Sequence, residues 1–525
     1  MLSSGPTKRW IGNQHMSKLH ERIGAQPRER LAGIRRGIEK EGLRVLPSGG
    51  LALTPHPQAL GSALTHPHIT TDYSESQIEL ITGAHKGVQD SLDELTATHQ
   101  FVHRVLAQHN GGEMLWGSSM PCGLPTDETI PLARYGSSNV GRAKSVYRMG
   151  LGHRYGRRMQ TISGIHYNWS LPGVTSEEYF ALIRNFRRQA FVLLYLFGAS
   201  PALCPCFVAG REHSLQPLGD GQNALYLPHA TSLRMGRLGY QSDAQATLAV
   251  SYNGLKGYAD SLHEALTRPY PAYEAVGVIN PGGEYNQLGT SLLQIENEFY
   301  GTIRPKRTVK TGERPLHALR ERGVEYVEVR LMDLDPFVPV GITAETMRLL
   351  DVFLLHCLLS DSPPDTPEEI AELKSNQHLA AERGREPGLL LSRRGESVRL
   401  TDWAADVLAE CLPLAASLDA ANDTDAYSAA LAAARALVAA PERTPSARVL
   451  AELRAQHGDN FGAFALHHSA AARDHLLALP WSDAQQQQFT EWAEQSLAAQ
   501  KAIEAADTLP FEAWRAQYMA VNELG

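Results

Sequence analysis

The sequence is poor in cysteine and has no long apolar run, and both features restrict the class of protein. Five cysteines are scattered over 525 residues: Cys122, Cys204, Cys206, Cys357 and Cys411. Such a set predicts no disulfide framework, so we expect a reducing, cytoplasmic location. The Cys204-x-Cys206 pair is too isolated to predict a zinc site. No apolar run approaches the roughly 20 residues of a membrane span. Residues 1–20 are polar, lack a signal-peptide core and are expected to form a flexible tail.

An excess of positive charge and the common ATP-binding motifs are also missing. The formal net charge of −8 gives no general attraction to nucleic acid or to an anionic membrane, so neither is expected as a partner. No GxxxxGK[ST] loop and no protein-kinase motif set occurs, which excludes a P-loop or kinase-like site. Basic clusters in this acidic chain therefore have to be explained as local sites.

The stretch 323–333, GVEYVEVRLMD, predicts a buried strand. Because side chains alternate on a strand, Tyr326, Glu328 and Arg330 are expected on one face. A carboxylate and a guanidinium on an apolar strand need partners if they are buried. Taken alone, this pair is more often a structural ion pair than a functional one.

Other segments offer partners for that face. GIEKEGLRV predicts a strand with Glu39 and Glu41 on one face. A helix starting near Thr71 or Ser74 would carry Glu79 two turns from Asp72. A strand over 160–170 would carry His166. Each group alone is also consistent with a surface carboxylate or a hydrogen-bonded core histidine.

The remaining segments predict mainly helices. Helices are expected over 87–110, 175–200 and 343–360, and from a serine cap at 137–138. The stretch 293–307 predicts a strand, then a turn, then a basic cluster containing Arg304, Lys306 and Arg307. Alanine-rich helices follow from about residue 402. We therefore expect a catalytic domain over 21–400 and a helical region over 401–525 that packs on it.

The carboxylates, with His166, outnumber what one structural ion pair needs. Hard oxygen ligands in this number suit two or three Mg²⁺ ions, or Mn²⁺ as the alternative. The basic residues suit the phosphates that such ions bridge. These residues by themselves predict only a multi-metal, nucleotide-using enzyme.

Eight stretches in order carry a more specific resemblance. They include GIEKEGLRV, TTDYSESQIELIT, MQTISGIHYNWSLP, LPHATSLRMGRLGY, LQIENEFYGTIRPKR and GVEYVEVRLMDLDPFVPVG. From about residue 31 to 345 the chain resembles proteobacterial glutamate–cysteine ligases. The resemblance implies an α+β, glutamine-synthetase-like carboxylate–amine ligase fold, with a curved antiparallel sheet forming a funnel or barrel surrounded by helices. It also implies ATP-dependent joining of the glutamate γ-carboxylate to the cysteine amino group through γ-glutamyl phosphate, the first step of glutathione biosynthesis.

The resemblance also implies roles for individual residues. The metal ligands would be Glu39, Glu41, Asp72, Glu79, His166 and Glu328. Arg330, with Glu328, would be catalytic. The ATP phosphates are expected to meet Arg304, Lys306, Arg307 and Arg330, an expectation that rests on the basic cluster itself. The amino-acid substrates would contact Tyr73, Tyr147, Gln160, Ile162, Arg234, Tyr240 and Tyr300, with Arg234 binding the cysteine carboxylate. A monomer or weak homo-oligomer is expected.

Three departures and three alternatives accompany this resemblance. Tyr73 stands where close relatives are expected to have Phe, residues 370–400 lack the cysteine pair of some relatives, and no second ATP-grasp-like domain is expected. A sister ligase with another amine acceptor would share the chemistry. A catalytically inactive homologue would be expected to lose metal carboxylates or Arg330. A glycosidase would need only two carboxylates.

Overall fold

An antiparallel sheet lies at the centre of the computed structural model, which describes residues 18–239, 243–246, 248–310 and 312–525. The strand order is β2-β3-β1-β5-β10-β9, and β4 pairs with β1 beside this path. The strands are β1 Arg35–Val45, β2 Ile69–Thr71, β3 Gln77–Ile81, β4 Met114–Leu115, β5 Ile165–Ser170, β9 Ile303–Lys306 and β10 Tyr326–Met332. Within the described residues β2 and β9 are edges. The α+β class is confirmed and the closed barrel is not observed, while the funnel curvature and the likeness to glutamine synthetase stay predictions.

The two faces of this sheet differ because apolar and charged residues alternate along its strands. Ile38, Tyr167 and Val329 lie in the main hydrophobic core. Their neighbours Glu39, His166 and Glu328 lie on the opposite face and line a cavity. The alternation expected for β1 and β10 is therefore confirmed.

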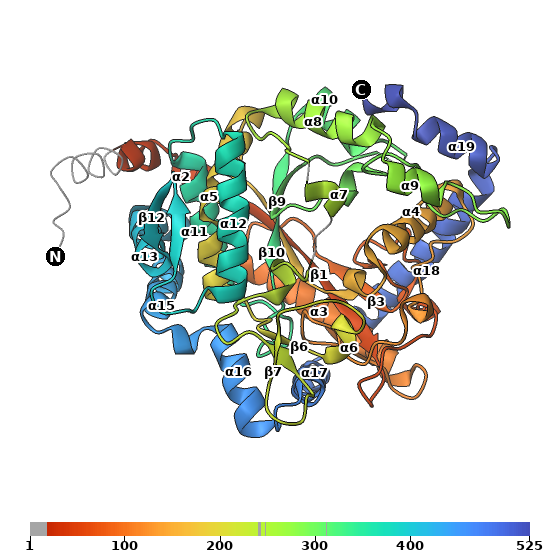
Figure 1. Cartoon of the computed structure of the whole chain (residues 1–525), viewed down its shortest axis with the longest axis horizontal. Coiled ribbons are helices and arrows are strands. Elements are labelled where there is room, and N and C mark those ends of the chain that lie inside the picture. The colour runs from red at the N-terminus through yellow and green to blue at the C-terminus, as the bar shows by residue number, and fades with distance from the viewer. Residues whose placement is uncertain (1–17, 240–242, 247, 311) are drawn as a thin grey trace.

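Helices cover the apolar face of the sheet (Figure 1). Helix α3 (Val88–Gln108) packs on β1 and β3, and α5 (Ser176–Phe197) packs on β9 and β10. Behind them lies α11 (Ala344–Leu359), which contacts both α3 and α5. The long helix predicted over 175–200 is confirmed: Thr175 begins α5 with a capping box, and Gly198 ends it.

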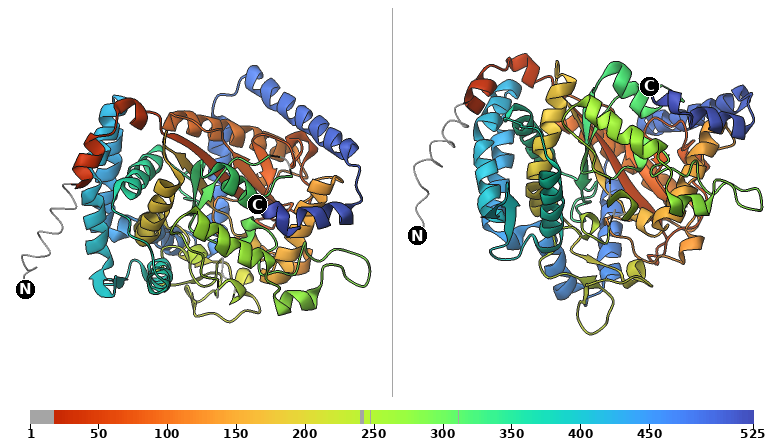
Figure 2. Two further views of the ribbon diagram at one scale, coloured as in Figure 1. Left: turned by 90° about the horizontal axis from the view of Figure 1, so that it is seen from above. Right: turned by 45° about the horizontal axis from the view of Figure 1, so that its top comes forward.

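The C-terminal quarter is helical, as predicted, and divides around the sheet. Figure 2 shows α13–α15 beside α5 and α11, whereas α18 and α19 lie on the opposite side of the molecule. The helices are α13 Leu400–Glu410, α14 Leu412–Asn422, α15 Ala426–Ala439, α16 Pro445–Gln456, α17 Phe461–Ala478, α18 Asp483–Ala506 and α19 Phe511–Tyr518. Leu19, Trp403 and Leu431 share one core cluster with the sheet, so neither proposed boundary, near 20 or near 400, interrupts the core. None of the described helices is long and apolar enough to cross a membrane.

Three local predictions were wrong. Residues 71–81 form no helix, because β2 and β3 pair as a hairpin with Thr70 opposite Glu79. The strand expected from Gln160 begins only at Ile165, and Gln160 lies in the 3-10 turn Met159–Thr161. No strand precedes β9 within 293–302, where Glu296–Glu298 form a 3-10 turn, and the basic residues Arg304 and Lys306 lie in the strand itself.

Candidate active site

A cavity of about 710 Å³ opens over the charged face of the sheet. Strands β1, β3, β5, β9 and β10 contribute to one wall. Most of the residues predicted for the site line this cavity: Glu39, Glu41, Asp72, Tyr73, Glu79, Tyr147, Gln160, His166, Arg234, Tyr300, Arg304, Lys306, Glu328 and Arg330. Residues separated by nearly 300 positions in the chain therefore meet around one space.

Strand register brings the carboxylates together. Glu39 is paired with His166 across β1 and β5, and Glu41 with Glu79 across β1 and β3. Paired residues on neighbouring strands present their side chains on the same face. The hairpin turn between β2 and β3 adds Asp72, whose backbone N–H donates to Gln77 O at 3.0 Å. The sequence predicted that Asp72 and Glu79 converge, but a hairpin does this instead of a helix.

Glu39, His166 and Glu328 form a group of candidate metal ligands in the cavity. One donor atom from each lies within 4.8 Å of the others. His166 Nδ1 is 3.0 Å from Glu39 Oε2, and Asn168 Nδ2 donates to Glu39 Oε1 at 2.9 Å. Two carboxylates and one imidazole at this spacing can hold a divalent cation.

Positive charge gathers around Glu328. Lys306 Nζ donates to Glu328 Oε1 at 2.9 Å, and Arg330 Nη1 donates to Glu328 Oε2 at 2.9 Å. Burial opposes ionisation of Glu328, but Lys306 and Arg330 outweigh it and lower the pKa of its carboxyl well below the usual range. Burial likewise opposes the charge of Arg330, yet Glu328 raises the pKa of its guanidinium. At this end of the cavity, β9 and β10 therefore carry an ionised carboxylate, Glu328, with cationic side chains around it.

The end around Glu41 and Glu79 has an excess of negative charge. Burial, followed by the charge of Asp72, raises the pKa of Glu41 to about 8. Burial and then the charges of Glu39, Asp72 and Glu41 raise the pKa of Glu79 well above its usual range. Divalent cations bound there would favour the ionised carboxylates, which is what a metal-ligand set requires.

A separate wall of the cavity combines a buried arginine with tyrosines. Arg234 Nη2 donates to Arg330 O at 2.9 Å, and Arg234 Nη1 lies 3.8 Å from Asp333 Oδ1. Asp333 is itself held by Ser200 and Ser232, whose hydroxyls donate to it at 2.7 and 2.9 Å. The two serines therefore hold Asp333, and Asp333 with Arg330 O fixes where the guanidinium of Arg234 lies.

Tyr300 is positioned on this wall by buried ion pairs in its own loop. Gln160 Nε2 donates to the Tyr300 hydroxyl at 2.7 Å. The preceding turn is anchored by Arg314 to Glu296 at 2.9 Å and by Arg154 to Glu298 at 2.8 Å. The carboxylates of Glu296 and Glu298 are thus engaged in holding the loop.

Three predicted residues are not placed in the cavity. Ile162 belongs to the second hydrophobic core cluster, and its carbonyl accepts a hydrogen bond from Gln77 Nε2 at 3.0 Å. Arg307 does not line the cavity, and its Nε lies 3.7 Å from Glu325 Oε2. Tyr240 falls outside the described residues.

The cavity also reaches basic residues that the sequence did not single out. Arg187 and Arg188 on α5, and Lys374 on α12 (Pro367–Arg383), line its far end. Arg188 is paired with Glu369 at 2.7 Å, and the N–H of Glu369 donates to Thr366 Oγ1 at the start of α12. In the sequence Arg187, Arg188 and Lys374 have the spacing of residues on solvent-exposed helix faces. Only the packing of α12 on α5 shows that they line the cavity.

Comparison with known proteins gives consistent matches. The family model described as glutamate–cysteine ligase matches residues 21–380. The glutamate–cysteine ligase of Azotobacter vinelandii is 51% identical over 505 residues, covering 92% of this chain and 94% of that protein. That of Alcanivorax borkumensis is 47% identical over 523 residues, covering 95% and 98%. The crystal structure of the Francisella tularensis glutamate–cysteine ligase in complex with AMP superimposes with a TM-score of 0.87 at 36% identity, covering 93% of this chain and 97% of that one.

Proposed function

Because the chain belongs to the glutamate–cysteine ligase family, we propose that it joins the γ-carboxylate of L-glutamate to the amino group of L-cysteine with hydrolysis of ATP to ADP and phosphate. One observation supports this reaction above all. Carboxyl groups, one imidazole and buried cations from five strands and a hairpin turn converge on a single cavity. Joining two amino acids with the use of ATP requires three substrates, each with at least one anionic group, to meet at one place.

The residues present fit divalent cations, and Mg²⁺ is the ion we propose. Glu39, His166 and Glu328 would hold one ion, and Glu41, Asp72 and Glu79 offer carboxylates for a second or third. Burial and the charge of neighbouring carboxylates raise the pKa of Glu41 and Glu79, and a cation bound at that end would counter both effects. When bound, the ions would neutralise the phosphate oxygens of ATP.

Arg330 and Lys306 would act on the transferring phosphoryl group. Both cations are fixed on Glu328, at the floor of the cavity, so they are oriented before substrate arrives. A preorganised positive charge stabilises the charge that develops on the phosphoryl oxygens. Arg304 is close to the same carboxylate, at 4.0 Å. In this step a γ-carboxylate oxygen of glutamate would attack the γ-phosphorus of ATP and ADP would leave, which gives γ-glutamyl phosphate. The cysteine amine would then attack the acyl carbon of that intermediate as phosphate leaves.

The wall of the cavity that contains Arg234 would bind the acceptor amino acid, cysteine. Arg234 is nearly fully buried, and its guanidinium is directed by Asp333 and Arg330 O. A buried guanidinium is well suited to a carboxylate. Tyr73, Tyr147 and Tyr300 would keep water from the acyl phosphate.

The test is turnover of ATP and Mg²⁺ by the purified protein, with and without each amino acid, and identification of the product by mass. We expect ADP and γ-glutamylcysteine only when both amino acids are present. Preference for another amine would assign the chain to a sister ligase. Absence of turnover in the folded, metal-loaded protein would contradict the proposal and identify an inactive homologue.

A further inference from the structure

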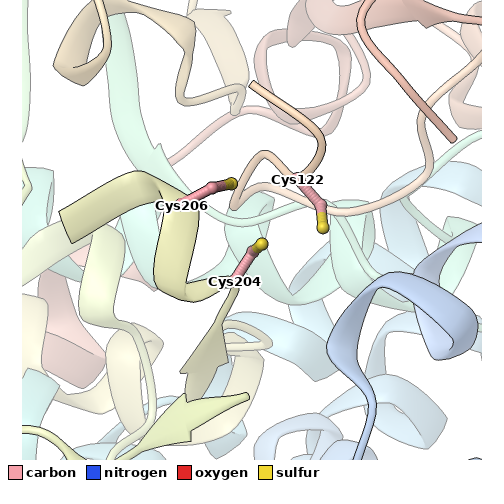
Figure 3. A group of neighbouring side chains, drawn as sticks. All are labelled: Cys122, Cys204 and Cys206. Atoms are coloured by element: carbon pink, nitrogen blue, oxygen red, sulfur yellow. The ribbon is translucent and has the colours of Figure 1, made fainter. Parts of the chain in front are cut away.

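Three of the five cysteines meet outside the cavity. Cys122 follows β4 in a loop, Cys204 follows β6 (Ala202–Leu203), and Cys206 lies in the short helix α6 (Pro205–Val208). One sulfur atom from each lies within 4.8 Å of the others, and Figure 3 shows them gathered between the loop and α6. From the sequence, the Cys204-x-Cys206 pair was judged too isolated for a metal site. The fold corrects that judgement, because it brings Cys122 beside the pair.

Sulfurs within 4.8 Å of one another are close enough to share one metal ion. A zinc–thiolate bond is about 2.3 Å long, so sulfurs that share an ion lie about 3.8–4.0 Å apart. All three thiols are free and half-buried, so an ion can reach them without unfolding. The other two cysteines, Cys357 and Cys411, are fully buried elsewhere in the core.

Several segments hold the thiols in place. Arg158 Nη1 donates to Cys206 O at 2.9 Å, and its Nη2 donates to Pro125 O at 3.3 Å, which ties the two cysteine segments together. Gly123, at a φ of 62°, has its Cβ position 2.6 Å from Gly49 O, so only glycine fits the turn after Cys122. A cluster fixed by the fold loses little freedom when it binds an ion.

Hydrogen-bond donors converge on one of the three sulfurs. The thiols of Cys122 and Cys204 and the backbone N–H groups of Leu124 and Gly123 all lie within hydrogen-bonding reach of the Cys206 sulfur. The thiolate is the form of cysteine that binds metal. Among the described residues no other Cys, His, Asp or Glu belongs to this group, so a fourth position would be left to solvent.

We propose that Cys122, Cys204 and Cys206 form a three-thiolate site for one thiophilic ion of the Zn²⁺ class, separate from the catalytic cavity. None of the three lines that cavity. The loop that carries Cys122 nevertheless contacts segments next to the cavity through Ser119. Ser119 Oγ accepts from Leu334 N at 2.8 Å, and Ser119 O accepts from Ser163 N at 3.0 Å. An ion at the thiols would brace the loop that carries Ser119.

The test is Co²⁺ titration of the full-length, reduced and chelator-treated protein. Co²⁺ substitutes for Zn²⁺ and reports thiolate ligation by a sulfur-to-metal charge-transfer band, which carboxylate ligands of the catalytic cavity do not produce. We expect one equivalent of this band, its displacement by Zn²⁺, and at least about tenfold weaker Co²⁺ binding in Cys122→Ser, Cys204→Ser and Cys206→Ser. Cys411→Ala removes one thiol elsewhere and is the matched control, expected to keep the band.

A second measurement uses the unaltered chain. Zn²⁺ is expected to slow alkylation of Cys122, Cys204 and Cys206, read by peptide mass, and to leave Cys357 and Cys411 unchanged. The proposal is overturned by absence of the charge-transfer band at saturating Co²⁺, by unchanged Co²⁺ affinity in Cys204→Ser, or by equal alkylation with and without Zn²⁺.

Discussion

Replacing Gly164 by alanine is expected to weaken cysteine binding specifically. A Cβ at this position would lie 2.5 Å from Cζ and 2.8 Å from Nε of Arg234. Carbon atoms in ordinary contact are about 3.5–4.0 Å apart, so the guanidinium has to move by about 1 Å. Gly164 is not among the residues with positive φ, so alanine fits its backbone. Its N–H donates to Glu41 Oε2 at 2.7 Å, and alanine retains that hydrogen bond.

The expected loss of cysteine affinity follows from the hydrogen bond between Arg234 and the cysteine carboxylate. A hydrogen bond to a charged group contributes about 1.5–3 kcal/mol, so misplacing Arg234 is expected to raise KM for cysteine by about 10- to 150-fold. If Arg234 binds the acceptor carboxylate equally in the ground and transition states, kcat changes little. The assay is initial-rate kinetics with each of cysteine, glutamate and ATP varied in turn.

The matched control is Gly50→Ala, where the nearest atom to the added Cβ is Ser48 Oγ at 3.8 Å. That variant is expected to have unchanged kinetics. An unchanged KM for cysteine in Gly164→Ala would refute the role of Arg234, provided the variant is folded. An equal rise in all three KM values would instead show a general distortion of the cavity and would equally count against that role.

Three further predictions test the other parts of the site. Arg330→Ala should lower kcat by about 10²–10³-fold with little change in KM for ATP; Arg307→Ala, outside the cavity, is the control, and equal losses in kcat and ATP affinity would contradict the role. Glu328→Gln should raise the Mg²⁺ concentration needed for half-maximal activity by at least about tenfold, whereas Glu325→Gln should not; an unchanged Mg²⁺ requirement would count against Glu328 as a ligand. Burial and nearby cations lower the pKa of His103 to about 3, so its neutral form stabilises the fold above pH 6.5, and stability is lost as the pH falls from 6.5 towards 3. Between pH 7.5 and 5.5 this amounts to about 1.4 kcal/mol, which His103→Gln should remove from the pH dependence of urea unfolding; an unaltered pH dependence would show that the imidazole is not held neutral.

The strands with strict alternation were predictable from sequence, and the hairpin was not. In β1 and β10 apolar residues alternate with charged ones, and the period of two identifies both the strand and its charged face. In 69–81 the polar residues Thr70, Thr71, Asp72 and Ser74 give no clear period, and the serine and threonine resemble helix caps. The structure uses them in a tight turn, where Ser74 Oγ donates to Pro131 O at 2.7 Å. Tertiary contact thus decides the conformation where the local pattern is ambiguous.

The cysteine trio shows a different limit of sequence reasoning. The nearest sequence signal is a two-residue C-x-C spacing, and the third thiol is more than 80 positions away. Its approach depends on β4 pairing with β1 and on Arg158 joining two loops, and neither contact has a local signature. Long-range placement of a single residue can be read from sequence only when a known family supplies it. The resemblance stated here assigned no role to these thiols.

Strand register explains why the charged side chains of the proposed site all lie on one face of the sheet. Because strand side chains have a period of two, a shift of β1 by one residue would turn Glu39 and Glu41 towards the core and Ile38 and Lys40 towards the cavity. Such a shift is opposed on both sides, since β1 is hydrogen-bonded to β3 and to β5. The ion pairs of Glu328 then need no flexible loop to assemble, because register alone sets Arg304 opposite Glu328 on β9. A site built this way keeps its charges in place before substrates bind, which is the condition under which buried cations stabilise a transferring phosphoryl group.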